Sequence, residues 1–207
     1  MTNPLPVPCL LAITDLPPTP RTIENIVLDV LSAGCRWIMY REKNASAESF
    51  RRTAMNLAKL CEEHEAVLCI NGDVGIAQEC SAGGVHLQAA DDVEAARVTL
   101  SSQALIGVSC HSIVDAQRAE LAGADYVTLS PVFETASKPG YGPALGLKGL
   151  VAAAREVSIP LIALAGISSA NTEDCIQHGA RGVAVMGGVM QAEDPAAAVK
   201  SLIAALG

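Results

Sequence analysis

The feature that most constrains the fold is one alternation, repeated along the whole chain. A short apolar, β-branched run is followed each time by a longer amphipathic run with helical spacing. Eight such units, with no linker or break in composition, predict an α/β fold: a single-domain (β/α)8 TIM barrel over residues 1–207. The expected strands are Leu10–Thr14, Trp37–Tyr40, Val67–Asn71, Gly84–Leu87, Leu105–Ser109, Tyr126–Ser130, Leu161–Ala165 and Gly182–Met186.

Helices are predicted between these strands, several of them ending at a glycine that turns the chain into the next strand. A doubly wound open sheet is the alternative architecture, but the even spacing of the units and the lack of a GxGxxG motif after the first strand favour the barrel. The expected helices are Thr22–Ala33, Ser46–His64, Val114–Ala122, Leu147–Val157, Thr172–Gln177 and Pro195–Leu206, with Asp73–Cys80 and Asp92–Leu100 less strongly indicated.

Composition narrows the class of protein. Half of the 207 residues are hydrophobic but only 3% are aromatic, so the core must consist of Ala, Val, Leu and Ile. The net charge of −8 argues against nucleic acid or an anionic membrane as the main partner. Seven scattered cysteines without a CxxC pair, no evident signal peptide and no membrane-length apolar run predict a reduced, cytoplasmic protein. Cys69 and Cys110 lie in predicted strands, where buried packing is expected.

The carboxyl ends of barrel strands meet at one mouth, where barrel enzymes carry their active sites. Cations that gather there in an acidic chain indicate an anionic, phosphorylated ligand. A salt bridge across the mouth is the alternative for Arg41, and a solvated loop is the alternative for the segment after strand six. The residues expected to bind substrate are Arg41, Lys43, Asn71, Ser109, Thr135, Ser137 and Lys138.

Two glycine turns follow the seventh and eighth strands, at the positions where barrels usually bind phosphate through backbone N–H groups. Gly166 and the pair Gly187-Gly188 permit close approach of the backbone to an anion. Ordinary tight turns are the alternative, and phosphate binding is the preferred interpretation.

Acid–base and metal chemistry have fewer candidates. His111 follows strand five and is the candidate general base, with a structural hydrogen-bonded histidine as the alternative. His86 lies inside strand four, where a core residue is expected. Asp91 and Asp73 could share Mg²⁺ with ligand phosphates, but helix capping is preferred for Asp73 and for Asp92.

Seven segments together resemble the thiamine phosphate synthase/TenI family over essentially the whole chain. They are AITD at Ala12–Asp15, REK at Arg41–Lys43, GVHL at Gly84–Leu87, IGVSCHS at Ile106–Ser112, AGADYVTLSPVFETASK at Ala122–Lys138, IPLIALAGIS at Ile159–Ser168 and GARGVAVMGGV at Gly179–Val189. The resemblance implies a (β/α)8 barrel of thiamine biosynthesis that binds a small phosphorylated thiazole.

The resemblance also implies residue roles. Arg41, Lys43 and Lys138 match cations that bind a pyrimidine diphosphate, and Ser109 matches a contact to the same substrate. Thr135 and Ser137 match hydroxyls on the thiazole side, and the glycine turns match the thiazole phosphate site.

Departures from the synthase pattern at Met39, at Gly72 and in the segment Gln88–Asp91 place the chain closer to the TenI-like branch. Met39 replaces a glutamine that holds the pyrimidine, and Gly72 replaces an aspartate that binds metal. Pro131 stands where the tautomerase has its histidine, so His111 is the proposed proton carrier.

Three functions follow from the resemblance. A TenI-like thiazole tautomerase, which needs no cofactor, is the leading hypothesis. A divergent thiamine phosphate synthase, with Mg²⁺ bound at Asp91, is the second. A catalytically inactive barrel that binds thiazole phosphate as a regulator is the third. A homodimer is a possible assembly for any of them.

Overall fold

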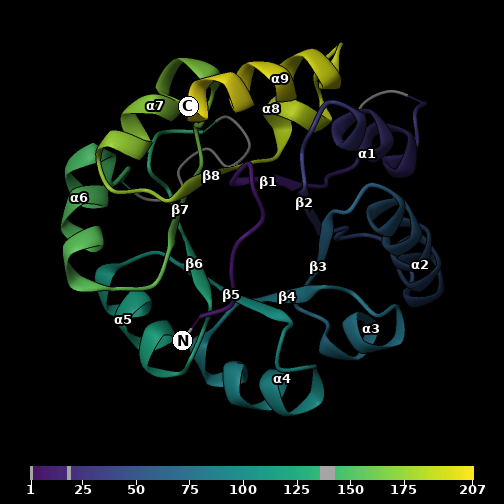
Figure 1. Ribbon diagram of the computed structural model, residues 1–207, viewed down its shortest axis with the longest axis horizontal. Coiled ribbons are helices and arrows are strands. Elements are labelled where there is room, and N and C mark those ends of the chain that lie inside the picture. Colours follow the sequence, from purple (N-terminus) through teal and green to yellow (C-terminus); the bar gives the residue numbers. More distant parts are fainter. Residues whose placement is uncertain (1, 18–19, 136–142) are drawn as a thin grey trace.

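The computed structural model describes residues 2–17, 20–135 and 143–207, and it forms a closed barrel of parallel strands in sequential order (Figure 1). The strands are β1 (Leu10–Ile13), β2 (Trp37–Tyr40), β3 (Val67–Asn71), β4 (Gly84–Leu87), β5 (Leu105–Cys110), β6 (Tyr126–Leu129), β7 (Leu161–Leu164) and β8 (Gly182–Val185). All eight predicted strands are confirmed, with ends that differ by at most one residue. The predicted barrel is therefore confirmed, and β8 closes it by pairing with β1.

Helices surround the barrel: α1 (Ile23–Ser32), α2 (Ala47–Glu63), α3 (Val74–Glu79), α4 (Val93–Thr99), α5 (Ile113–Leu121), α6 (Gly146–Glu156), α7 (Ser169–Gln177), α8 (Gly187–Met190) and α9 (Pro195–Leu206), with a 3-10 turn at Ala90–Asp92. The short helix α8 was not predicted, because its glycines disfavour helix in isolation. Helix α7 begins at Ser169, three residues before the predicted start, since Ser168 and Asn171 form a capping box. Within the described ranges no helix is both long and apolar enough to cross a membrane.

The core has two layers, because alternate strand residues face opposite sides of the barrel wall. Leu10 and Ala12 pack outward against the helices, whereas Leu11 and Ile13 pack inward. The inner layer is small and contains two large aromatic side chains, Trp37 and Tyr126, both fully buried. Their rings meet edge to face with centroids 4.7 Å apart. These two aromatic side chains thus fill much of the inside of the barrel, whereas Tyr40 stacks on Phe50 in the outer layer.

The ring of Tyr126 fits inside the barrel because Gly107 has no side chain. The two residues are register partners on β5 and β6, and a Cβ on Gly107 would overlap the tyrosine ring. Gly107 therefore leaves space for a large ring inside a narrow barrel. The ring and Trp37 close the barrel interior below the mouth.

The cysteines act as apolar packing groups. All seven are free thiols, and Cys69 and Cys110 are fully buried, as predicted. Burial raises the pKa of the Cys69 thiol to about 11 and that of Cys110 to about 12. Thiols held in the protonated form are poor nucleophiles, so neither is suited to covalent catalysis.

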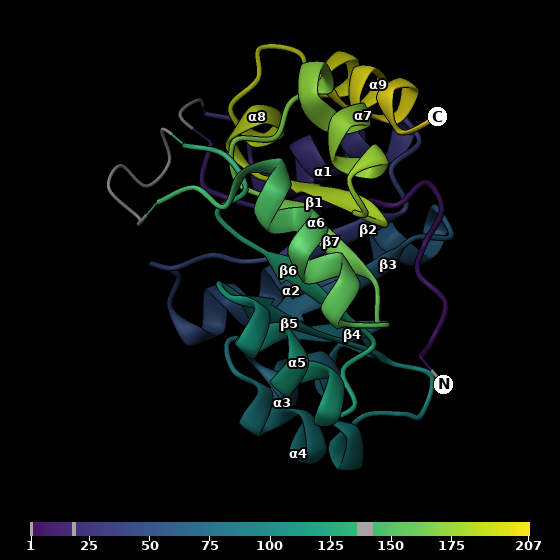
Figure 2. The same ribbon diagram turned by 90° about the vertical axis from the view of Figure 1, so that its left-hand side faces the viewer.

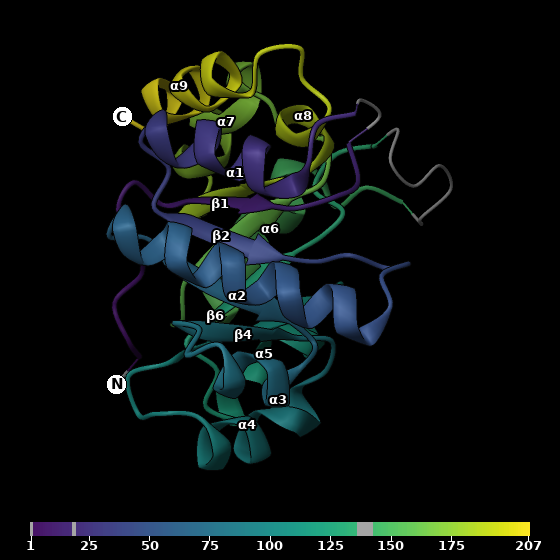
Figure 3. The same cartoon turned by 90° about the vertical axis from the view of Figure 1, so that its right-hand side faces the viewer.

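The strands all run toward one end of the molecule. In Figure 3 the arrows of β1 and β2 point away from both chain termini, and Figure 2 shows the same end from the other side. Helix α8 and the loops after β6 and β7 lie at this end. The side chains that follow the strands are thus brought to one mouth, as the barrel fold requires.

Candidate active site

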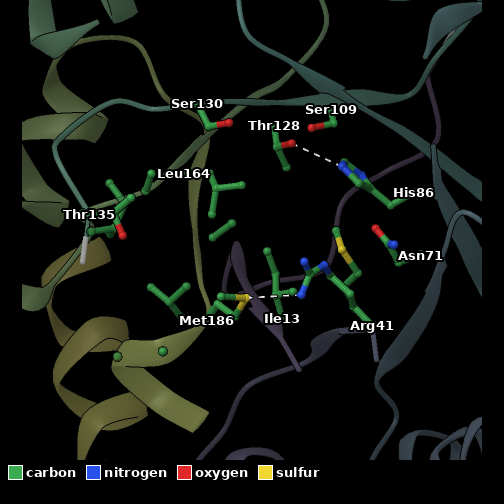
Figure 4. A pocket seen from close by; sticks show the side chains of 18 of the residues that line it. Ile13, Arg41, Asn71, His86, Ser109, Thr128, Ser130, Thr135, Leu164 and Met186 are labelled. Carbon is green, nitrogen blue, oxygen red and sulfur yellow. Dashed lines mark hydrogen bonds between the residues drawn. The ribbon is translucent and has the colours of Figure 1, made fainter. Parts of the chain in front are cut away.

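A cavity of about 680 Å³ opens at the carboxyl ends of the strands. Figure 4 shows side chains from β1 to β8 pointing into it. Nine of the residues predicted from the sequence line this cavity: Arg41, Lys43, Asn71, Ser109, His111, Thr135, Gly166, Gly187 and Gly188. The predicted residues Ser137 and Lys138 lie outside the described residues.

The backbone of Arg41 is held in place by the side chain of Thr14. The buried hydroxyl of Thr14 donates to the carbonyl oxygen of Arg41 and accepts from its N–H, both at 2.8 Å. This hydroxyl extends the pairing of β1 with β2 by one residue. The Arg41 guanidinium lies 3.9 Å from Met186 Sδ and 3.9 Å from Asp15 Oδ1 (Figure 4). The ion pair with Asp15 is at the limit of contact, so the guanidinium can meet an anion in the cavity.

Replacement of Thr14 by valine is expected to lower both stability and substrate affinity. Valine has nearly the same shape but leaves a buried N–H and a buried C=O without partners, at a cost of about 2 kcal/mol. Urea unfolding and steady-state kinetics measure the two effects. Thr14→Ser, which keeps the hydroxyl, should restore most of both. Equal losses in the serine variant would mean that the methyl group, and not the hydroxyl, positions Arg41.

His111 lies between β5 and β6 at the rim of the cavity. Its Nδ1 is 2.9 Å from the carbonyl oxygen of Ser130 and 3.2 Å from the Ser130 hydroxyl. A carbonyl oxygen only accepts, so the neutral ring carries its proton on Nδ1 and has its acceptor at Nε2. The His111 N–H donates to Asp115 Oδ2, which helps to fix the start of α5. The arrangement gives the ring a defined tautomer, as a proton carrier requires.

His86 forms part of the cavity floor. Its Nδ1 lies 3.2 Å from the Tyr126 hydroxyl, and its Nε2 lies 3.2 Å from the Thr128 hydroxyl (Figure 4). Burial lowers the pKa of His86 to about 3, so the ring is neutral near pH 7. The prediction of a hydrogen-bonded core histidine is confirmed. Its place at the bottom of the cavity could not be read from its position within a strand.

The turn after β7 carries two consecutive residues with positive φ, Ala165 at 78° and Gly166 at 66°. The turn is tied to the loop after β6, because the Phe133 N–H donates to the Ala165 carbonyl oxygen at 3.1 Å. The Asn171 side chain donates to the Gly166 carbonyl oxygen at 2.9 Å. The glycine turn is therefore held in one conformation beside Gly187 and Gly188, as a preformed anion site needs.

The carboxylates predicted as metal ligands do not meet in the cavity. Asp91 is exposed and lines a separate groove between α4 and α5. Asp73 accepts the Ile76 N–H at 2.9 Å and caps α3, as preferred from the sequence. Asp92 occupies the N-cap position of α4, as predicted, but its side chain makes no cap hydrogen bond.

The two carboxylates predicted to share Mg²⁺, Asp91 and Asp73, are therefore not placed to bind it in the cavity. No cluster of three or more His, Cys, Asp or Glu side chains suited to a metal occurs within the part of the chain that the structure describes. The Mg²⁺ site predicted at Asp91 is not supported by this geometry.

Several cavity residues were not predicted as site residues from the sequence. Thr128 and Ser130 lie two residues apart and face the cavity together, which strand alternation could have indicated. Glu134 also lines the cavity and is exposed. It belongs to a loop, whose side-chain directions do not follow a period.

Comparison with known proteins shows which family the chain belongs to. A family described as thiamine monophosphate synthase matches residues 10–189, which include all eight strands. The chain belongs to this family. The resemblance inferred from the sequence motifs is thereby confirmed, and the protein is assigned to thiamine biosynthesis.

Individual relatives agree over most of their length. A putative thiamine-phosphate synthase of Geobacter sulfurreducens is 37% identical over 187 residues, covering 90% of this chain and 88% of the relative. A thiamine-phosphate synthase of Chloroflexus aurantiacus is 35% identical, covering 88% and 84%. The structure of thiamine phosphate pyrophosphorylase from Pyrococcus furiosus superposes with a TM-score of 0.84 at 31% identity, covering 95% and 94%. These names support an enzyme of the synthase family and do not single out the tautomerase branch.

Proposed function

We propose that this protein forms thiamine phosphate by coupling a phosphorylated thiazole to a pyrimidine diphosphate, with release of pyrophosphate. The observation that carries the proposal is one cavity, of about 680 Å³, that combines Arg41 and Lys43 with the glycine turns after β7 and β8. Its volume is within the range of small-molecule sites, and its polar groups suit phosphate oxygens. The synthase names of relatives at 35% and 37% identity support the same reaction.

Each group of cavity residues has a proposed role that follows from its chemistry. Backbone N–H groups at Gly166, Gly187 and Gly188 bind the thiazole phosphate. Arg41 and Lys43 bind the diphosphate and stabilise the negative charge that develops as pyrophosphate leaves. The hydroxyls of Ser109 and Thr135 orient the two substrates. Ile13, Met39 and Leu164 give the rings an apolar surface.

The Mg²⁺ ligand predicted at Asp91 lines a separate groove and not the cavity, and no cluster of three or more metal-binding side chains occurs among the described residues. The proposal therefore assigns charge stabilisation to the cations of the chain, and no step is assigned to a metal. The cavity wall formed by the ends of β3 and β4 carries the neutral side-chain amides of Asn71 and Gln88. The Gln88 Nε2 donates to Asn71 Oδ1 at 3.2 Å.

The test is a two-substrate assay that measures pyrophosphate release with and without Mg²⁺. We expect release only when the thiazole phosphate and the pyrimidine diphosphate are both present. Release from the diphosphate alone would indicate simple hydrolysis. No release under either condition, with thiazole phosphate still binding by calorimetry, would reject the synthase and leave the tautomerase and the regulator.

A second candidate, the thiazole tautomerase, is favoured by His111. A tautomerase moves a proton between carbon and a heteroatom and needs one acid–base group beside the ligand. His111 lines the cavity, and its hydrogen bond to the Ser130 carbonyl sets the tautomer with an acceptor at Nε2. The chemistry requires no carboxylate cluster.

Replacement of His111 by asparagine separates the two candidates. Asparagine retains a hydrogen-bonding side chain but cannot transfer a proton near neutral pH, so tautomerisation should fall by about a hundredfold or more. Binding of the thiazole phosphate should persist. Conversion of the carboxythiazole phosphate followed optically gives the rate, and calorimetry gives the affinity. Full tautomerase activity in His111→Asn would reject the role of this residue.

A further inference from the structure

Met186 brings a sulfur atom to the part of the cavity where phosphate groups are expected to bind. It is half-buried, lines the cavity and directly precedes the glycine pair that begins α8. Its carbonyl oxygen accepts from the N–H groups of Val189 and Met190, at 3.1 and 2.9 Å. The backbone of Met186 is therefore fixed by the same turn that carries the proposed phosphate site.

The sulfur atom contacts the arginine that is proposed to bind the diphosphate. Met186 Sδ lies 3.9 Å from Arg41 Nη1, and Figure 4 shows the two side chains pointing toward one another. A thioether is only a weak acceptor, so this contact does not compete with a phosphate for the guanidinium. A chemical change that made the sulfur group a strong acceptor would act directly on anion binding.

Met186 is also the more accessible sulfur atom of the cavity. Among the described residues that line the cavity, only Met39 and Met186 contain sulfur. Met39 is 2% exposed on β2, whereas Met186 is partly exposed at the mouth. A small oxidant that enters the cavity therefore meets Met186 before Met39.

The cysteines do not compete for such an oxidant. No cysteine lines the cavity in the part of the chain that the structure describes. Burial raises the pKa of all seven thiols, so each is held in its protonated form near neutral pH. Peroxides attack the thiolate, whereas a thioether reacts without ionising. The methionine is thus the sulfur atom suited to oxidation near the substrates.

We propose that Met186 is an oxidation site at which a peroxide forms methionine sulfoxide and thereby weakens diphosphate binding. The O–O bond of the peroxide breaks, one oxygen atom bonds to Sδ, the sulfur atom gives up two electrons, and the second oxygen atom leaves as water. Because Sδ is already 3.9 Å from Arg41 Nη1, an oxygen atom on Sδ can accept a hydrogen bond from the guanidinium. It then competes with the ligand. The proposal rests on the anion-binding role proposed for Arg41.

The first test maps the reaction of each methionine with dilute hydrogen peroxide by mass spectrometry of peptides. Met186 and Met55, which is 42% exposed on α2, should be oxidised. Met39 and Met190, each 2% exposed, should react at least about tenfold more slowly. Inorganic pyrophosphate should slow the oxidation of Met186 and leave that of Met55 unchanged, because Met55 does not line the cavity.

The second test measures the affinity for inorganic pyrophosphate by calorimetry before and after oxidation. The oxidised protein should bind about tenfold more weakly, because the sulfoxide occupies a charged donor of Arg41. Methionine sulfoxide reductases of both stereospecificities should restore the affinity. Damage to the fold would not be reversed in this way, and circular dichroism checks that the barrel remains folded.

Two leucine variants assign the effect to one residue. Leucine keeps the apolar volume of methionine and cannot be oxidised. Met186→Leu treated with peroxide should bind pyrophosphate as well as its own untreated form. Met55→Leu is the matched control, and its affinity should still fall after treatment.

The proposal is wrong if Met186 is oxidised no faster than Met39, if its oxidation leaves pyrophosphate affinity unchanged, or if Met186→Leu is as sensitive to peroxide as the unsubstituted protein. The synthase reaction is tested separately. A protein that binds pyrophosphate in an oxidation-sensitive way but couples no substrates would reject the synthase and retain the oxidation site. An active synthase that is insensitive to oxidation of Met186 would do the reverse.

Discussion

Replacement of Gly166 by alanine is expected to destabilise the protein by about 3 kcal/mol or more and to abolish binding of the thiazole phosphate. The backbone of Gly166 has φ of 66°, a region that L-residues rarely adopt. An added Cβ would lie 2.5 Å from the Glu134 carbonyl oxygen and 2.6 Å from Phe133 Cβ. Both neighbours belong to the loop after β6, which also carries Thr135. The substitution would therefore push apart the two loops that form this side of the cavity.

Two matched alanine variants separate the causes of this loss. Gly123 has φ of 88°, and an added Cβ there would have no heavy atom within 4 Å, so Gly123→Ala isolates the backbone cost of about 1 kcal/mol. Gly188 is near the predicted phosphate but open, the nearest atom to an added Cβ being the Ile167 carbonyl oxygen at 4.0 Å. Gly188→Ala should leave stability unchanged. Urea unfolding and calorimetric titration measure both quantities. If Gly166→Ala is no less stable than Gly123→Ala, the loops are not packed as described.

Replacement of Arg41 by methionine should lower kcat/KM for pyrophosphate release by about a hundredfold or more. The side chain lines the cavity beside Met186, and its backbone is fixed by the buried Thr14 hydroxyl. Methionine keeps much of the length and apolar stem but removes the charge and the paired donors. Arg41→Lys should recover only part of the loss, because an ammonium group cannot bind two phosphate oxygens in the planar geometry of a guanidinium.

The control for Arg41 is the same change at a surface arginine. Arg52 is exposed on α2 and does not line the cavity, so Arg52→Met should be fully active. Measuring KM for each substrate separately adds a second check. The resemblance to the family places Arg41 at the diphosphate, so its loss should raise KM for the pyrimidine diphosphate. An effect confined to the thiazole phosphate would instead assign Arg41 to the phosphate on the glycine turns.

The barrel could be predicted from the sequence because its signal is repeated. Each strand is a short apolar run such as Trp37–Tyr40, and several helices end near a glycine such as Gly34 or Gly123. An error in one unit does not disturb the count of the others. The short helix α8 escaped prediction because Gly187 and Gly188 have low helix propensity, and only the fold holds them in a turn.

The site was predicted where residues follow strands directly, and less well elsewhere. Arg41 and Ser109 reach the cavity because a strand carries them to its carboxyl end. Asp91 also follows a strand, but the 3-10 turn at Ala90–Asp92 turns it to the outer groove. Proximity in sequence to a strand end therefore does not place a side chain in the cavity once a loop intervenes. Exposed Glu134 was missed for the same reason, as its direction is set by its own loop.

The aromatic floor of the barrel has a kinetic consequence. Trp37 and Tyr126 fill the interior below the cavity, and the eight strands around them are completely described. There is thus no passage along the barrel axis, and molecules that enter over the strand ends must depart by the same opening. When a site has a single opening, substrate binding depends on product release. A new substrate cannot enter until the last product has left. Under the proposed reaction, product that lingers at the mouth would slow each new cycle, independently of how fast the bond is made.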